Sequence, residues 1–381
     1  MNPRIVVAYN RDFEGAEADP ENKAREDIKD IAENVLRILK ANGFHVTGLG
    51  VTGDVLAAVA AIRELRPHVV FNLCESIGGD NRFEPLLPLL LDREGVAYTG
   101  SGPLALSLAL HKHKAKDVLR ARGVPTPEAL FVTTEDVSGV NLPFPLIVKP
   151  SREDASVGIY SESVVHDRAA LAERVATVLS RYRQPALVER YIDGREIYVS
   201  LFGQPSGPPQ VFPFYEIDFS DMPAGRPHIV SFEGKWVESS DEYRGTKPVR
   251  CQGLSPELQR RITQIALQAF EAMELRDYAR FDFRLATDGT PYVIDVNPNC
   301  DLSDIAGGFS KAAKAGGLSY DEVILRLVEL ALLRRSDVDT IPLAPRAQTA
   351  RRNRRADRPL ATDGDAVVPG ERASRKRARS G

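Results

Sequence analysis

Two acidic residues, an arginine and an asparagine share one predicted hairpin, whose strands read YARFDFRLA and PYVIDVN. The strands alternate apolar and polar residues, and Asp288-Gly289 between them is a favoured pair for a two-residue type I′ loop. Counted outward from that loop, Asp282 lies opposite Asp295 and Arg280 lies opposite Asn297, all on one face. Facing carboxylates repel unless a cation lies between them, and hard cations such as Mg²⁺ take oxygen ligands. The hairpin therefore predicts a metal site with an arginine beside it.

A second pattern suits phosphate. Lys149 ends the β-branched run LIVK, and a stretch of small and polar residues follows over 151–158. Lysine supplies a point charge to phosphate, and small residues let backbone N–H groups approach anionic oxygens. Lys235, in FEGKW, is another lysine that could serve phosphate. A flexible turn and an exposed lysine are the alternative interpretations, and the residues alone leave them open.

Two glutamates, Glu189 and Glu196, flank an Asp-Gly turn in LVERYIDGREIYVS. Adenosine sites need acceptors for the ribose hydroxyls and the adenine amino group, and carboxylates between strands can provide them. Without context, two solvated glutamates explain the pattern equally well.

The elements that must position these residues change in kind along the chain. The first hundred residues alternate strand and helix, which predicts βαβ units and a mostly parallel sheet. Short strands with one helix among them follow, then irregular stretches at 205–213 and 220–250. Further helices are predicted over 22–42, 104–122, 256–273 and 320–333. We therefore expect an α/β protein with a substrate domain at 1–100, a central lobe at 101–185, a C-terminal lobe at 186–335 and a disordered basic tail at 336–381.

Bulk properties point to a cytoplasmic protein. The three cysteines show neither zinc-site nor disulfide spacing, no signal peptide precedes the first strand, and no apolar run reaches the ~18 residues that span a bilayer. The tail holds eleven Lys or Arg and six Asp or Glu, a net charge of +5. A solvated tail is the preferred interpretation, and nucleic-acid binding through residues 346–379 is the alternative.

Taken together and in order, these segments resemble the ATP-grasp superfamily, most closely its D-alanine–D-alanine ligase branch. The matching segments lie between Phe71 and Asp301 and read NLCE, AYTGSGPLALSLALHK, KPSRE with SVG, ERYIDGRE, and RFDFR with DVNPN. The resemblance implies an ATP-grasp fold, in which an N-terminal parallel α/β domain precedes two α+β lobes that clasp ATP.

Residue by residue, the resemblance implies an ATP site formed by Lys112, Lys149, Glu189, Tyr191, Glu196 and Lys235. It implies two Mg²⁺ ions, for which Mn²⁺ can substitute, bound by Asp282, Asp295 and Asn297. The implied catalytic residues are Arg280, Lys235 and Ser156. The family reaction phosphorylates a carboxylate with ATP, and an amine then attacks the acyl phosphate. The expected substrates are small amino acids or related carboxylates and amines, and a homodimer is compatible with the resemblance.

The chain departs from the family pattern where the amino acids bind. Ala155 stands in place of a catalytic serine, although Ser156 follows, and Trp236 stands in place of a loop tyrosine. Asp295 replaces a glutamate, and residues 299–302 read Asn-Cys-Asp-Leu instead of Ser-Pro-Gly-Met. The family's N-terminal glutamate has three candidates, Glu14, Glu17 and Glu21. The sequence therefore predicts a ligase of unspecified substrate, and an ATP-binding protein without ligase turnover is the alternative.

Overall fold

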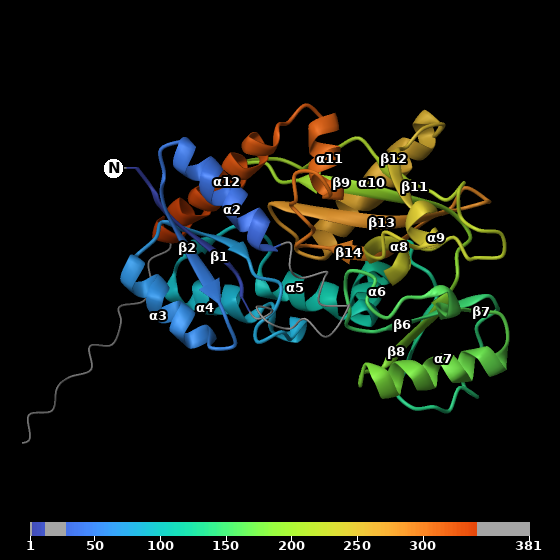
Figure 1. Cartoon of the computed structure of the whole chain (residues 1–381). Helices are drawn as coiled ribbons and strands as arrows, with labels where there is room; N and C mark the ends of the chain where they lie inside the picture. The colour runs from blue at the N-terminus through green and yellow to red at the C-terminus, as the bar shows by residue number, and fades with distance from the viewer. Residues whose placement is uncertain (1, 12–27, 341–381) are drawn as a thin grey trace, which may run out of the picture. The chain divides into compact units, whose positions relative to one another are not determined.

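The structure is a computed structural model that describes residues 2–11 and 28–340. Its first sheet is parallel. Its strands are ordered β2-β1-β3-β4. They span β1 (Arg4–Asn10), β2 (His45–Val51), β3 (Val69–Leu73) and β4 (Ala97–Tyr98). Helices α2 (Ile28–Ala41) and α12 (Tyr320–Thr340) pack on one face, and α3 (Val55–Leu65) and α4 (Leu86–Glu94) pack on the other (Figure 1). The parallel sheet that the alternating pattern predicts is confirmed.

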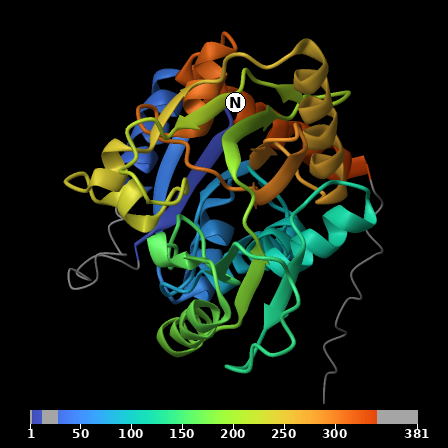
Figure 2. The ribbon, with the colours of Figure 1, turned by 90° about the vertical axis from the view of Figure 1, so that its right-hand side faces the viewer.

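The second sheet is antiparallel, with the strand order β5-β8-β6-β7. Its strands span β5 (Ala129–Val132), β6 (Leu146–Pro150), β7 (Val164–Val165) and β8 (Ala186–Arg190). Helix α7 (Arg168–Arg181) lies along this sheet (Figure 2) and buries one apolar face against its strands. The residues of β8 were assigned to the C-terminal lobe, but they pair with β5 and β6, so this sheet ends near residue 190.

The third sheet is the largest and is also antiparallel, with the order β12-β11-β9-β13-β14 and β10 beside β9. Its strands span β9 (Gly194–Phe202), β10 (Gln210–Val211), β11 (Tyr215–Asp218), β12 (Lys247–Arg250), β13 (Tyr278–Ala286) and β14 (Pro291–Asn297). Its core is shared with α5 (Pro103–Leu110), α6 (Lys112–Ala121) and α10 (Pro256–Ala272). The remaining short helices are η2 (Asn81–Phe83), η3 (Ser161–Ser163), α8 (Phe232–Trp236), α9 (Asp241–Arg244) and α11 (Gly308–Ala315).

The segment 220–250 is less irregular than predicted, because two serines begin short helices in it. Ser231 caps α8 by accepting a hydrogen bond from the Gly234 N–H at 3.0 Å. Ser240 caps α9 by accepting one from the Tyr243 N–H at 2.9 Å. Serine followed by acidic residues is a common helix start, so this signal was present in the sequence.

The helix predicted over 104–122 is in fact two helices, α5 and α6, which break at His111. The Lys112 N–H donates to the carbonyl of Ser151, at 3.2 Å, instead of continuing the pattern of α5. The break therefore ties the start of α6 to the loop that follows Lys149. The spacing of apolar residues along a helix cannot predict this break, because the partner of the Lys112 N–H lies far away in the sequence.

The predicted loop type of the β13–β14 hairpin is wrong, although its predicted pairing is right. The loop consists of the three residues 287–289. Its last residue, Gly289, has a φ of 81° and donates its N–H to the Ala286 carbonyl, and the Ala286 N–H donates to the Thr290 carbonyl. This shifts the register by one residue near the turn, and an irregularity between Asp282 and Phe283 shifts it back. Because the two shifts cancel, Asp282 still faces Asp295, and Arg280 still faces Asn297.

The C-terminal helix α12 extends to Thr340, beyond residue 336 where the tail was predicted to begin. Residues 341–381, which hold most of that tail and the nucleic-acid alternative, lie outside the described residues, as do Glu14, Glu17 and Glu21. None of the described helices is long and apolar enough to cross a membrane.

Candidate functional site

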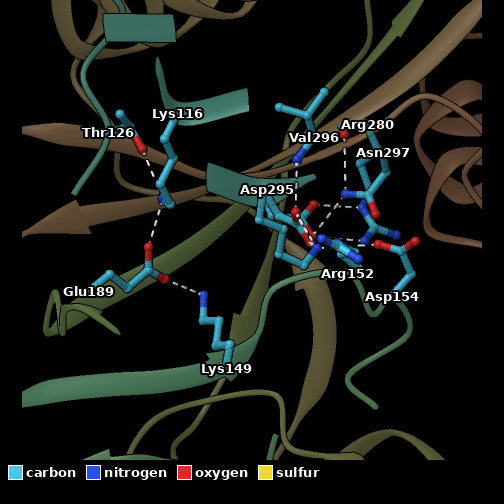
Figure 3. Close-up of polar contacts among 12 residues, drawn as sticks. Lys116, Thr126, Lys149, Arg152, Asp154, Glu189, Arg280, Asp295, Val296 and Asn297 are labelled. Atoms are coloured by element: carbon cyan, nitrogen blue, oxygen red, sulfur yellow. Dashed lines mark hydrogen bonds and ion pairs between the residues drawn. The ribbon is translucent and has the colours of Figure 1, made fainter. Parts of the chain in front are cut away.

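A buried carboxylate joins the second sheet to α6. Glu189, on β8 and 1% exposed, lies between two lysines (Figure 3). Its Oε2 is 2.7 Å from the Nζ of Lys116, and its Oε1 is paired with the Nζ of Lys149 at the end of β6. Burial alone would raise the pKa of Glu189, but the two ammonium groups lower it to about 2. The cluster therefore places two positive charges beside a single negative one.

Lys116 is the functional candidate that the sequence analysis missed. It lies on the buried face of α6, where its ammonium also donates to Thr126 Oγ1 at 3.0 Å. Burial lowers the pKa of Lys116, although the charge of Glu189 opposes that shift. A lysine at a helix position that is buried was the available signal, since such a residue needs a buried partner.

The β13–β14 hairpin presents its polar face as predicted. Arg280 binds Asp282 through two hydrogen bonds, Nε to Oδ1 at 2.7 Å and Nη2 to Oδ2 at 2.9 Å. Its guanidinium also lies over the Tyr198 ring, at 4.6 Å from the centroid. Asn297 Nδ2 lies 3.3 Å from Asp282 Oδ2. Burial alone would lower the pKa of Arg280, but Asp282 raises it well above its usual value, so the guanidinium stays charged.

Lys112 contacts the polar face of the β13–β14 hairpin, where the metal ligands are predicted, and does not belong to the Glu189 cluster. Its Nζ is 2.9 and 3.1 Å from the two carboxylate oxygens of Asp295 and 3.3 Å from Asp154 Oδ1. Burial would raise the pKa of Asp295, but the Lys112 charge and hydrogen bond outweigh it and lower that pKa. Lys112 and Lys149, which the resemblance assigns to one ATP site, thus contact different carboxylates.

The hairpin face fits a hard cation by its donor set. Asp282, Asp295 and Asn297 offer carboxylate and amide oxygens, the ligands that Mg²⁺ prefers. In the part of the chain that the structure describes, no group of three or more His, Cys, Asp or Glu could hold a metal. An ion here would therefore take part of its coordination from elsewhere, such as substrate phosphates.

Of the residues predicted to bind adenosine, Glu196 lies where β9 and β13 pair, whereas Glu189 lies on β8 and Tyr191 lies between β8 and β9. Glu196 is 2.7 Å from Arg284 Nη2 and accepts a hydrogen bond from the Tyr198 hydroxyl at 3.1 Å. Burial raises the pKa of Glu196, and Arg284 opposes that shift. The Tyr191 hydroxyl donates to the His228 carbonyl at 3.2 Å, which ties it to the segment before α8. Arg284, which the sequence analysis did not single out, is thus the counter-charge of Glu196.

The segment that carries α8 is joined to the loop after β6. Trp236 Nε1 donates to the Ala155 carbonyl at 2.9 Å, and Ser156 Oγ donates to the Val230 carbonyl at 2.9 Å. Ala155 and Ser156 both have positive φ, 53° and 62°, a conformation that is strained for residues other than glycine. The predicted catalytic Ser156 therefore has its hydroxyl bound to backbone. Burial lowers the pKa of the neighbouring Lys235.

One cleft is lined by residues of the hairpin, of α8 and of the loop after β6. Arg280 and Asn297 line it from the hairpin, Lys235 and Trp236 from α8, and Asp154 from the loop after β6. The first sheet contributes residues that follow β3. Cations, oxygen ligands and a covering segment thus surround a single space.

The sequence matches known proteins over most of its length. A family model described as "D-ala D-ala ligase C-terminus" matches residues 118–329. The D-alanine–D-alanine ligase of Chromohalobacter salexigens is 31% identical over 330 residues, which are 86% of this chain and 93% of that protein. The uncharacterised protein y4sG of Sinorhizobium fredii is 36% identical over 263 residues, 69% of this chain and 74% of the relative.

Solved structures share the fold. The crystal structure of D-alanine–D-alanine ligase from Bacillus anthracis complexed with ATP superposes with a TM-score of 0.67 and 21% identity. The match covers 88% of this chain and 99% of that one. The predicted arrangement of a parallel α/β domain and two α+β lobes is therefore confirmed as the ATP-grasp fold.

The Glu189 cluster predicts a specific dependence of stability on pH. Because the folded state lowers the pKa of Glu189 to about 2, its charge stabilises the fold above pH ~4.5 and loses this effect as the pH falls towards 2. We expect the free energy of unfolding of Glu189→Gln to be lower than that of the native chain at pH 6. That difference should shrink by about 3 kcal/mol as the pH falls towards 2. Denaturant unfolding at several pH values measures it, and a difference independent of pH would contradict the assignment.

Proposed function

The chain belongs to the D-alanine–D-alanine ligase family, and from this membership we propose that it is an ATP-dependent ligase that joins a carboxylate to an amine. The observation that best supports the proposal is a pair of charged clusters that α6 joins, since its Lys116 contacts Glu189 and its Lys112 contacts Asp295. Lys116 and Lys149 offer positive charge for phosphates, and Asp282, Asp295 and Asn297 offer oxygen ligands for the cation that accompanies ATP.

The reaction proceeds in two steps. A carboxylate oxygen of the first substrate attacks the γ-phosphorus of ATP, the bond from that phosphorus to the ADP oxygen breaks, and an acyl phosphate forms. The nitrogen of the second substrate attacks the acyl carbon, inorganic phosphate leaves with the C–O bonding electrons, and the amine loses a proton. Phosphorylation is needed because a free carboxylate is a poor electrophile.

In this proposal the chain's own residues hold charge in place at each step. Lys116 and Lys149 hold the phosphates of ATP, with Glu189 keeping both lysines charged and in position. Tyr191 and Glu196 contact the adenosine, and Lys235 reaches the terminal phosphates from α8. Arg280, fixed by Asp282, donates to the oxyanion of the tetrahedral intermediate.

Two Mg²⁺ ions, held by Asp282, Asp295 and Asn297, would neutralise charge on ATP and on the transferring phosphoryl group. For these side chains to serve, Lys112 must move from Asp295 towards the phosphates, which suits the ATP role that the resemblance gives it. Asp154 Oδ1, which lies 3.3 Å from Lys112 Nζ, would stay paired with the ammonium group when Lys112 leaves Asp295.

Protection of the acyl phosphate from water falls to the α8 segment. The contacts of Trp236 with Ala155 and of Ser156 with Val230 hold that segment over the loop after β6. Since an exposed acyl phosphate hydrolyses, we assign these contacts to water exclusion. In this assignment Ser156 positions the α8 segment through its hydrogen bond to Val230, and Trp236 covers the site as the family's tyrosine does.

The wider assignments extend from the same proposal. Residues 1–100 form the substrate domain, and two lobes that hold ATP follow, one from residue 101 to β8, which ends at Arg190, and the other from there to residue 335. A cytoplasmic location follows from the use of ATP, and a homodimer stays a prediction of the resemblance.

Asp282 is the position at which the ligase proposal is tested most simply. With ATP, MgCl₂ and pools of amino acids, the purified full chain should release ADP and phosphate, and Asp282→Asn should lower kcat by at least about a hundredfold. Asp288→Asn, in the exposed loop of the same hairpin, should leave kcat unchanged. ATP binding without ADP formation from any pool would instead support the non-catalytic alternative.

Lys116 should affect nucleotide affinity. Lys116→Met removes one of the two ammonium groups beside Glu189, so we expect ATP to bind at least about tenfold more weakly. Lys114→Met is the matched control, because Lys114 is exposed two residues away on the same helix, where its Nζ lies 3.6 Å from Asp117 Oδ2. Titration with a fluorescent ATP analogue measures both, and equal affinities would remove Lys116 from the site.

A further inference from the structure

A buried arginine joins the predicted adenosine residues to the segment that precedes α8. Arg284 lies on β13 directly opposite Glu196 of β9 and is 4% exposed. Its Nη2 is 2.7 Å from Glu196 Oε2, and its Nη1 donates to the carbonyl of Gly194, the first residue of β9, at 3.1 Å. Nη2 also donates to the carbonyl of His228, which lies between β11 and α8. One guanidinium therefore ties two paired strands to a segment outside them.

Two aromatic rings lie beside the same guanidinium. Its carbon is 5.5 Å from the centroid of the Phe219 ring and 5.8 Å from that of the Tyr191 ring. Guanidinium groups at such distances are attracted to aromatic faces. Phe219 stacks on the His228 ring, with 5.3 Å between centroids, so both belong to the group around Arg284. We call residues 219–231, between β11 and α8, the connecting segment.

The connecting segment is also attached to the second sheet. Ile229 is buried in a small apolar cluster with Ile147 of β6 and Val164 of β7, and Tyr191 packs against that cluster. The segment is therefore held by the second sheet through Ile229 and by the third sheet through Arg284. These are the two sheets that contribute the predicted adenosine residues.

Arg284 also fixes the carboxylate that we assign to the adenosine. Oε2 of Glu196 contacts Arg284, and Oε1 accepts a hydrogen bond from the Tyr198 hydroxyl at 3.1 Å. Glu196 is only 5% exposed, and a carboxylate so buried needs such partners to stay charged. Each carboxylate oxygen can accept more than one hydrogen bond, so the fixed group can still accept from ribose hydroxyls.

The two arginines on this face of β13 have separate partners. Alternate residues of a strand share a face, so Arg284 lies on the same face as Arg280 and Asp282. Arg280 binds Asp282 through two hydrogen bonds, whereas Arg284 contacts Glu196. The charge of Arg284 is thus matched by Glu196 inside the fold, and its remaining N–H groups hold backbone carbonyls.

We propose that Arg284 is a positioning residue of the nucleotide site, which holds the Glu196 carboxylate for the ribose and holds the connecting segment against the third sheet. The inference rests on the ATP binding in the proposed function and deepens it, but it does not depend on turnover. Because one guanidinium serves both contacts, ribose binding and the fixed position of the connecting segment favour each other.

The shape of the guanidinium, and not its charge alone, is what this role requires. Arginine presents its N–H groups in a rigid planar fork, so Glu196 and the two carbonyls are held in one arrangement. Lysine carries the same charge on a flexible stem and cannot reproduce that fork. Arg284→Lys therefore separates positioning from charge.

Calorimetric titration of the full chain with ATP, 2′-deoxy-ATP and 3′-deoxy-ATP in MgCl₂ tests the contact with Glu196. The native chain should bind ATP at least about tenfold more tightly than the weaker of the two deoxy analogues. In Arg284→Lys, ATP should bind at least about tenfold more weakly, and the preference for ATP should fall below about threefold. A lysine variant that binds all three nucleotides like the native chain would overturn the proposal.

Arg195→Lys is the matched control. Arg195 precedes Glu196 on β9, so its side chain lies on the opposite face of the strand, where its Nε is 2.7 Å from Glu216 Oε2. It breaks an ion pair of the same kind and distance away from the predicted site, so nucleotide affinities should stay within about twofold of native values. Equal effects of the two lysine substitutions would contradict a specific role for Arg284.

A double-mutant cycle distinguishes positioning from direct contact with ATP. If Arg284 acts through Glu196, Arg284→Lys should weaken ATP binding by less than about threefold in a chain that already carries Glu196→Gln. Additive effects would make Arg284 a direct ligand and overturn the positioning role. If Arg284→Lys does not fold, the variant with Arg284→Met and Glu196→Gln, which removes both buried charges together, takes its place in the nucleotide titrations.

Hydrogen exchange tests the contact with the connecting segment without relying on nucleotide. Amide groups of residues 219–231 should exchange at least about tenfold faster in Arg284→Lys than in the native chain or in Arg195→Lys, with α10 unchanged. ATP should slow exchange of this segment in the native chain more than in Arg284→Lys. Unchanged exchange would overturn the proposal. If none of the chains binds ATP, the proposed function fails, and the exchange rates still decide whether Arg284 holds the segment.

Discussion

Two carboxylates, Asp282 and Asp295, face each other across β13 and β14, and their charges must be neutralised for the hairpin to form. The structure does this with side chains from different places: Arg280 from the same strand binds Asp282, and Lys112 from the start of α6 binds Asp295. Lys112 reaches that position because the helix breaks at His111 and its N–H binds Ser151. The break between α5 and α6, the loop after β6 and the hairpin are therefore parts of one electrostatic arrangement.

The need to neutralise buried charge also accounts for the cluster of Glu189, Lys116 and Lys149. Glu189 is fully enclosed and stays ionised because Lys116 and Lys149 flank it, which leaves one positive charge in excess. A triphosphate with its cation adds negative charge near the lysines and positive charge near the carboxylates. ATP binding would thus satisfy both groups at once, which explains why each is tolerated in a buried position.

Much of the fold could be predicted from local patterns, whereas the partners of buried charges could not. The helix predicted over 256–273 agrees with α10 to within one residue, and the pairing of Asp282 with Asp295 was found even though the loop type was wrong. Alternation and turn residues carry that information. The contact between Lys112 and Asp295 spans 183 residues, and Lys116 was missed because helical spacing shows only that a position is buried. Family resemblance supplied the predicted reaction, and residues 299–302 mark where the chain departs from the family pattern.

The central claim is that the carboxylate substrate becomes an acyl phosphate, and transfer of an oxygen isotope tests it most directly. With a substrate labelled with ¹⁸O in its carboxylate, one labelled oxygen should pass to the inorganic phosphate for each amide bond formed, because the amine displaces the phosphate with that oxygen attached. Mass spectrometry of the released phosphate measures this transfer. Phosphate that carries the label in proportion to product is the result that the account predicts. Amide formation with unlabelled phosphate would contradict it.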